Sequence, residues 1–190
     1  MPDPIDPQRT ALLVLDYQNG IINSMPEAER LLAGAAQAIA QARAAGVTIG
    51  YVRVAFADGE RPQGMMARRF GPDVAERMQA DADATQIHTA VAPQPGDIVV
   101  RKNRVGSFST TDLDKQLRAR GIDTLLLAGV STSGVTLSTV RDGFDRDYEL
   151  FVISDLCADR RPEVHEFLIS SVLPAQAEVI TAAELAGLLG

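Results

Sequence analysis

Three polar features each follow a short apolar segment of this sequence. Asp16 comes directly after a run of apolar residues, Lys102 ends a second such segment, and the glycine- and hydroxyl-rich residues 129–134 follow a third. A carboxyl group can act as a general acid or base, an ammonium group can orient it, and the N–H groups of a turn at a helix N-terminus can bind an anion or a developing oxyanion. Residues 129–134 could equally be an ordinary strand-to-helix connection in which Ser133 caps the helix.

The segments that would position these groups alternate between strand and helix patterns. Short apolar runs predict strands, whereas helical spacing, a helix-starting proline or a closing glycine predicts helices. The predicted strands are 11–15, 47–55, 98–100, 124–128, 149–154 and 178–181, and the predicted helices are 26–45, 110–120, about 134–144, 162–172 and 182–189. Residues 56–80 are rich in Gly and Pro and are predicted to be mostly loop, with one or two helical turns at 74–78. This alternation predicts a mainly parallel sheet with helices on both faces and a site beyond the carboxyl ends of the strands.

Length and composition limit the classes of function. The 190 residues, 46% of them hydrophobic, fit an exposed N-terminal arm at 1–9 and a single domain at 10–190. A formal net charge of -7 argues against a general nucleic-acid or membrane-surface binder, and no apolar run approaches the ~20 residues of a membrane span. The N-terminus has no signal-peptide pattern, and the single cysteine, Cys157, excludes an intrachain disulfide. We therefore expect a cytoplasmic protein that acts on a small molecule.

Three stretches, 13–18, 95–113 and 127–148, together resemble a known family. In their order, spacing and residue types, they resemble the isochorismatase-like, or cysteine hydrolase, superfamily over about residues 10–185. The resemblance implies a Rossmann-like three-layer α/β/α sandwich and a catalytic Asp, Lys and Cys, of which the first two correspond to Asp16 and Lys102. The position of the nucleophilic cysteine holds Val135 in this sequence. Isochorismatases proper also lack that cysteine, so the resemblance allows an enzyme but excludes the usual thiol mechanism.

The resemblance also implies roles for individual residues. Asp16 would be the general acid or base, and Lys102 would lie within salt-bridge or one-water distance of it as a fixed positive charge. The strained turn of the family implies a non-proline cis peptide at Val130–Ser131. The turn residues expected to bind a carbonyl or carboxylate oxygen are Val130, Ser131, Thr132, Ser133 and Gly134.

Further contacts with substrate are expected outside the turn. The cationic segment 53–70, with Arg61, Met65 and Met66, is predicted to act as a lid, although an exposed loop is an equally open interpretation. The possible substrate contacts are Gln18, Phe108 and, from the lid, Arg68, Arg69 and Phe70.

The other reactive side chains are interpreted as structural. Nothing near Cys157 in the sequence would lower the pKa of its thiol, and no histidine in the motif would activate a serine. His88 and His165 are widely spaced and lie outside any Asp-x-His-x-x-His pattern. We therefore expect no metal and no cofactor.

The sequence thus predicts an isochorismatase-like hydrolase without a cysteine nucleophile, acting on a small carboxylate- or amide-bearing metabolite and assembled as a homodimer or larger homo-oligomer. The alternative is a catalytically silent relative that retains a small-molecule pocket. Val135 favours that alternative, whereas the retention of Asp16 and Lys102 argues against it. A nucleotide-binding Rossmann domain is the weakest hypothesis, because residues 129–134 do not match G-x-G-x-x-G and follow a late strand.

Overall fold

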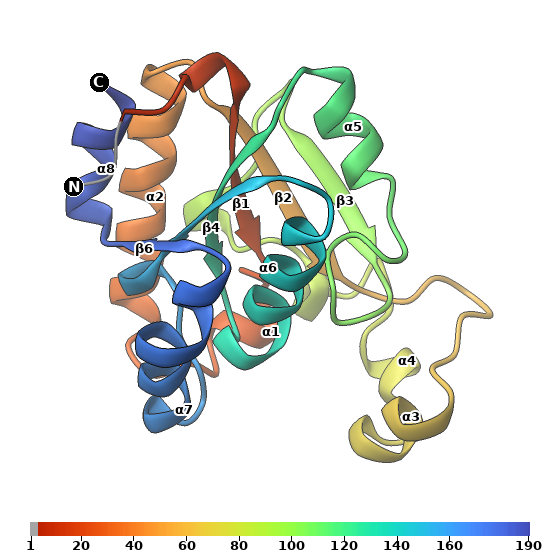
Figure 1. Ribbon diagram of the computed structural model, residues 1–190. Coiled ribbons are helices and arrows are strands. Elements are labelled where there is room, and N and C mark those ends of the chain that lie inside the picture. The colour runs from red at the N-terminus through yellow and green to blue at the C-terminus, as the bar shows by residue number, and fades with distance from the viewer. Residues whose placement is uncertain (1–3) are drawn as a thin grey trace.

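The computed structural model describes residues 4–190 and has one six-stranded parallel sheet at its centre (Figure 1). The strands lie in the order β3-β2-β1-β4-β5-β6. Their bounds are Thr10–Leu15 (β1), Thr48–Val54 (β2), Ile98–Lys102 (β3), Thr124–Gly129 (β4), Glu149–Ile153 (β5) and Glu178–Ile180 (β6). The central strands β1 and β4 are buried along their whole length, as expected for continuous apolar runs covered on both faces.

Helices cover both faces of the sheet and complete the predicted α/β/α sandwich. The helix bounds are Asn19–Ile22 (α1), Ala28–Ala44 (α2), Gly64–Phe70 (α3), Val74–Arg77 (α4), Leu113–Ala119 (α5), Leu137–Phe144 (α6), Pro162–Phe167 (α7) and Ala182–Leu189 (α8). Leu31 of α2 and Leu185 of α8 belong to one buried apolar cluster, and Leu113 of α5 and Val140 of α6 belong to a second one on the opposite face (Figure 1). None of the helices among residues 4–190 has the length and apolar character that crossing a bilayer requires.

Local deviations from the predicted elements have identifiable causes. Residues 64–70 form the helix α3 and not a loop, because Gly64 and Gly71 bound the helix with positive φ angles of 59° and 92° and do not interrupt it. The predicted helix 162–172 continues from α7 into a π-helical turn at Leu168–Val172. In the expected N-terminal arm, Asp6 caps a 3-10 turn at Pro7–Arg9, and residues 1–3 lie outside the described residues.

Candidate active site

Asp16 and Lys102 lie side by side at the carboxyl end of the sheet. Lys102 Nζ donates to Asp16 Oδ2 at 2.8 Å and to the carbonyl oxygen of Val105 at 2.6 Å. The two residues follow β1 and end β3, and β2 holds both backbones between them: Asp16 N donates to the Val52 carbonyl oxygen, and Ala55 N donates to that of Lys102. The predicted approach of the two side chains is confirmed, since parallel strands bring their carboxyl ends to one edge.

The environment of the Asp16 carboxylate is unusual for an ion pair. Its side chain is 8% exposed and that of Lys102 is 1% exposed. Burial raises the pKa of Asp16 above its ordinary value, and the Lys102 ammonium opposes this rise. Asp16 Oδ1 is buried and has no hydrogen-bond partner among residues 4–190. Buried polar atoms almost always have a partner, so this oxygen is available to a water molecule or a substrate.

The turn that follows β4 has fewer free hydrogen-bond donors than predicted. The peptide bond Val130–Ser131 is cis, as predicted, and a π-helical turn at Thr132–Thr136 leads into α6. Thr132 N donates to the carbonyl oxygen of Ala158 at 2.8 Å. The backbone N–H and the hydroxyl of Ser133 both donate to Asp159 Oδ2, at 2.9 and 2.6 Å. These donors are directed toward the segment after β5 and are not free to bind a substrate oxygen.

Ser131 keeps a free donor in this turn. Its backbone N–H has no hydrogen-bond acceptor within residues 4–190, whereas Val130 N donates to the carbonyl oxygen of Leu15 and Gly134 N to that of Ser131. A Cβ at position 134 would lie 2.7 Å from Ser131 Oγ, so a larger residue there would force the Ser131 side chain to move. Among the five predicted turn residues, Ser131 is therefore the one that best fits an oxyanion donor.

Val135 occupies the position at which the resemblance implies a cysteine. It is 2% exposed and belongs to the apolar cluster that also contains Leu15 and Val52. Cys157, the single cysteine of the chain, is buried. The Thr136 hydroxyl donates to its Sγ and the thiol donates to the carbonyl oxygen of Leu127, both at 3.9 Å, and burial raises the pKa of the thiol to about 11. At neutral pH the thiol is therefore protonated and unreactive.

Two predicted substrate contacts have structural roles instead. Gln18 is fully buried: its Nε2 donates to the carbonyl oxygens of Val54 and Thr85 at 2.9 and 2.8 Å, and its Oε1 accepts from Val54 N at 2.7 Å. Phe108 is buried and stacks on Tyr148, with ring centroids 5.9 Å apart. Both residues lie close to the site in sequence, but their side chains are buried and make their contacts with other residues of the protein, not with a ligand.

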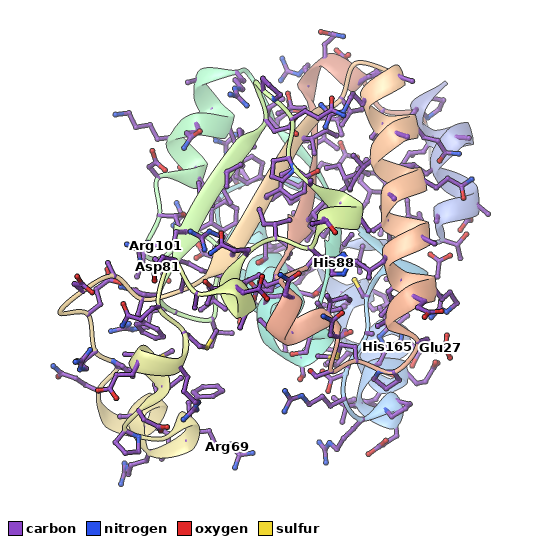
Figure 2. All side chains as sticks on the ribbon, turned by 180° about the vertical axis from the view of Figure 1, so that it is seen from behind. Glu27, Arg69, Asp81, His88, Arg101 and His165 are labelled. Carbon is purple, nitrogen blue, oxygen red and sulfur yellow. The ribbon has the colours of Figure 1, made fainter. Side chains whose placement is uncertain are left out.

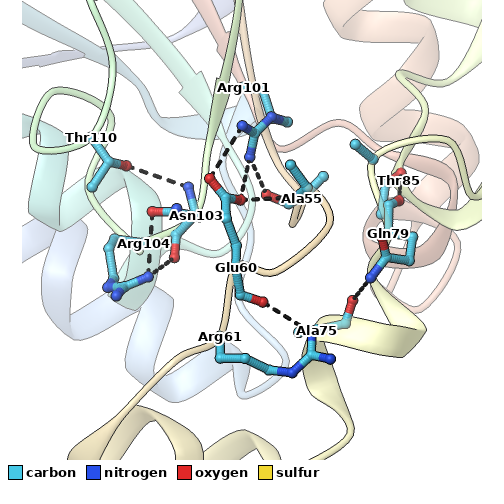
Figure 3. A network of polar contacts seen from close by, with 12 residues as sticks. Ala55, Glu60, Arg61, Ala75, Gln79, Thr85, Arg101, Asn103, Arg104 and Thr110 are labelled. Carbon is cyan, nitrogen blue, oxygen red and sulfur yellow. Dashed lines mark hydrogen bonds and ion pairs between the residues drawn. The ribbon is translucent and has the colours of Figure 1, made fainter.

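The predicted lid is anchored at its base. Arg101 donates to Glu60 Oε2 at 2.7 Å and to the Ala55 carbonyl oxygen at 3.0 Å, which ties the segment before α3 to the end of β3 (Figure 3). Beyond this point α3 projects away from the sheet (Figure 1), and Arg69 points outward from it (Figure 2). Arg68, Arg69 and Phe70 are all exposed, so the structure does not bring them to the Asp16–Lys102 pair.

A lid function for α3 thus requires α3 to close over the site, and it stays a prediction. If α3 closes, the variant Arg68→Glu/Arg69→Glu should weaken the binding of anionic ligands by about tenfold and that of neutral ligands much less, because a guanidinium binds carboxylates through charge-assisted hydrogen bonds. Dissociation constants for matched anionic and neutral ligands, measured by calorimetry, would test this. Equal effects on both ligand types would make α3 an ordinary exposed helix.

Asp159 and His165 also contact the turn, and neither is among the predicted site residues. Asp159 binds Ser133, and His165 Nδ1 lies 2.8 Å from the hydroxyl oxygen of Thr132. A signal for both exists in the sequence, because they follow the strand next to β4 in a parallel sheet, where polar residues gather at the same edge. His88 is structural as expected: its Nδ1 accepts from Ala90 N at 3.1 Å.

Comparison with known proteins identifies the family. The isochorismatase domain family matches residues 10–184. A protein named "Probable isochorismatase" from Pseudomonas chlororaphis is 33% identical over 95% of this chain and 86% of the relative. The ureidoacrylate amidohydrolase RutB of Methylobacterium radiotolerans is 31% identical over 90% of this chain and 76% of the relative. The crystal structure of a cysteine hydrolase from Pseudomonas syringae pv. phaseolicola 1448A is similar with a TM-score of 0.89 and 28% identity, covering 99% of this chain and 95% of that one. On the match over residues 10–184, this chain belongs to the isochorismatase family.

Proposed function

We propose that this chain is a hydrolase in which Asp16 is the general acid or base and no cysteine acts as nucleophile. The observation that carries this proposal is the Asp16 carboxylate itself. Lys102 binds Oδ2 at 2.8 Å, while Oδ1 is buried without a partner. An oriented carboxyl group with one free oxygen is what proton transfer to or from a substrate requires.

The chemistry follows from the two forms of this carboxyl group. Ionised Asp16 can accept a proton from a water molecule that attacks an amide or ester carbonyl, and can then pass that proton to the amine or alcohol that leaves as the C–N or C–O bond breaks. Protonated Asp16 can donate its proton to the double bond of an enol ether; water then adds to the resulting cation and returns a proton to the Asp16 carboxylate, and the hemiketal breaks down to a ketone and an alcohol. The raised pKa of Asp16 brings the protonated form closer to neutral pH. The Ser131 N–H would stabilise negative charge on a carbonyl oxygen in the first case.

Enol-ether hydrolysis suits this site better than amide hydrolysis. It needs a general acid and no covalent nucleophile, and the position of the family nucleophile is the buried apolar Val135. The relatives are named for both chemistries, an isochorismatase and a ureidoacrylate amidohydrolase. We therefore propose a small carboxylate- or amide-bearing metabolite as substrate, with the enol ether as the first class to try.

A hydrolase screen tests the proposal. The purified protein would be assayed against vinyl ethers, amides and esters that carry a carboxylate or amide group, beside Asp16→Asn. We expect at least one substrate whose turnover disappears in Asp16→Asn. Turnover that is unchanged in Asp16→Asn would contradict the assignment of the site.

The second candidate is a catalytically silent protein that binds a small molecule at the same site. Its support is the closed site, in which the Asp16 and Lys102 side chains are both buried and no thiol replaces the family nucleophile. The two candidates differ in one observable. A silent relative would be stabilised against heat by a ligand from the same panel, and that ligand would be recovered unchanged.

The variant Val135→Cys distinguishes a site with a mechanism that needs no thiol from a cysteine hydrolase that has recently lost its nucleophile. The replacement is close in volume, and the new thiol would lie near a helix start and near Lys102, both of which favour the thiolate. We expect no new amidase or esterase activity, because the retention of Asp16 and Lys102 in otherwise family-like motifs favours a mechanism without a thiol. The measurement is thiol labelling with an esterase assay, with Val140→Cys as the matched buried control. Stoichiometric labelling at position 135, together with Asp16-dependent turnover, would contradict this expectation.

A further inference from the structure

The turn at residues 130–134 is bound by the segment that follows β5. Val130 pairs with Ala158 in a short parallel bridge, and Thr132 N donates to the Ala158 carbonyl oxygen at 2.8 Å. Two side chains of the same segment, Asp159 and His165, bind the next polar groups of the turn. The backbone on both sides of Ser131 is therefore fixed by the segment that follows β5.

The buried Asp159 carboxylate has its main hydrogen-bond donors in the turn. The residue is only 9% exposed, and among residues 4–190 no lysine, arginine or histidine lies within ion-pair distance of it. Its Oδ2 accepts from the N–H and the hydroxyl of Ser133, and its Oδ1 accepts from Arg161 N at 3.4 Å. Since hydrogen bonds to a charged acceptor are about twice as strong as neutral ones, Asp159 is the strongest single hold on the turn.

His165 fixes the neighbouring residue. It lies on α7, half-buried, and its Nδ1 is 2.8 Å from Thr132 Oγ1. Thr132 is fully buried, and its amide is already bound to Ala158. The hydrogen bond from α7 thus fixes the orientation of the Thr132 side chain; Figure 2 labels His165.

We propose that Asp159 and His165 are positioning residues, which act through Ser133 and Thr132 to aim the Ser131 N–H at the substrate beside Asp16. Its catalytic meaning rests on the amide or ester form of the proposed hydrolase function, because only that reaction develops negative charge on a carbonyl oxygen, whereas the hold on the turn does not. Neither residue touches the reacting atoms, so their loss should lower kcat and leave KM nearly unchanged.

The test uses the variants Asp159→Ala and His165→Phe, with Asp159→Asn and His165→Asn as conservative partners that keep one hydrogen bond each. Glu163→Gln is the matched control, since Glu163 lies on α7 with a side chain 71% exposed. The first readout is amide hydrogen exchange at residues 131–136, which requires no substrate. We expect exchange there to become about ten- to a hundredfold faster in Asp159→Ala and less so in His165→Phe, with the strands still protected.

The second readout is kcat against KM on an amide or ester substrate from the hydrolase screen. We expect kcat to fall by about tenfold or more in Asp159→Ala, with partial rescue in Asp159→Asn and no change in Glu163→Gln. Unchanged exchange at the turn, or equally faster exchange throughout the chain, would overturn the positioning role. Faster local exchange with unchanged kcat would also overturn it. If the wild-type protein turns nothing over, the proposed function fails; if it turns over enol ethers but no amide or ester, the catalytic part of this inference fails. In both cases the exchange data alone decide whether the two residues hold the turn.

Discussion

Lys102→Met is expected to lower the free energy of unfolding by about 3–5 kcal/mol at pH 7, because removing one partner of a buried ion pair leaves an uncompensated charge. The charge left behind is the Asp16 carboxylate, whose pKa burial already raises in the wild-type protein. The chain should still fold, because methionine replaces the buried lysine stem with a similar volume. Urea denaturation with an unchanged m-value would measure the loss.

The loss should depend on pH in a defined direction. Without Lys102, the folded-state pKa of Asp16 rises further above the unfolded value of about 3.9. A group with a raised folded-state pKa contributes its full stability below the unfolded pKa and loses it as the pH rises through the folded pKa. The difference between Lys102→Met and the wild-type protein should therefore be small near pH 4 and grow toward pH 7.

The double variant Asp16→Asn/Lys102→Met is the control for this prediction. Replacing both members of a buried ion pair is often neutral or stabilising, so the double variant should recover most of the stability that the single variant loses. A Lys102→Met protein as stable as the wild-type protein at pH 7 would show that the pair is not buried as the structure describes it.

Asp16→Asn should lower kcat/KM by about 10²–10⁴, the usual contribution of a general acid or base. Asparagine matches aspartate in shape and tolerates the left-handed conformation of this residue, whose φ is 58°, so the backbone of the site should be preserved. Most of the loss should fall on kcat, because the missing group acts in the transition state. Asp145→Asn, an exposed position at the end of α6, is the matched control.

The pH dependence of the wild-type activity then identifies the role of Asp16. If Asp16 is a general acid, the rate should fall as the pH rises through its pKa, which lies above the ordinary value for aspartate. If Asp16 is a general base, the rate should rise over the same range. Initial rates across the pH range, with stability checked at each pH, measure this, and a flat profile together with full activity in Asp16→Asn would contradict both roles.

The parts of this protein that depend on local pattern were predictable from the sequence. Continuous apolar runs identify the buried parallel strands, and because such strands end at one edge, Asp16 and Lys102 could be paired although they are far apart in the chain. The side-chain directions were not predictable. Gln18 is two residues from Asp16, yet its amide bonds to Val54 and Thr85 inside the protein.

The residues missed by sequence analysis depend on packing between elements. Ser133 has the sequence context of an N-cap or an oxyanion donor, but its hydroxyl binds Asp159, which comes from the next crossover connection. His165 meets Thr132 only because α7 packs beside the π-helical turn. No spacing rule within one segment predicts such contacts.

The most direct test of the central claim is a single-turnover reaction in H₂¹⁸O, followed by mass spectrometry of both product and protein. If Asp16 moves protons and water attacks the substrate, the product should carry one ¹⁸O, and the protein should keep its unmodified mass throughout. Label in the peptide that contains Asp16, or a transient adduct on the protein, would contradict the account and show that a covalent intermediate forms on this chain.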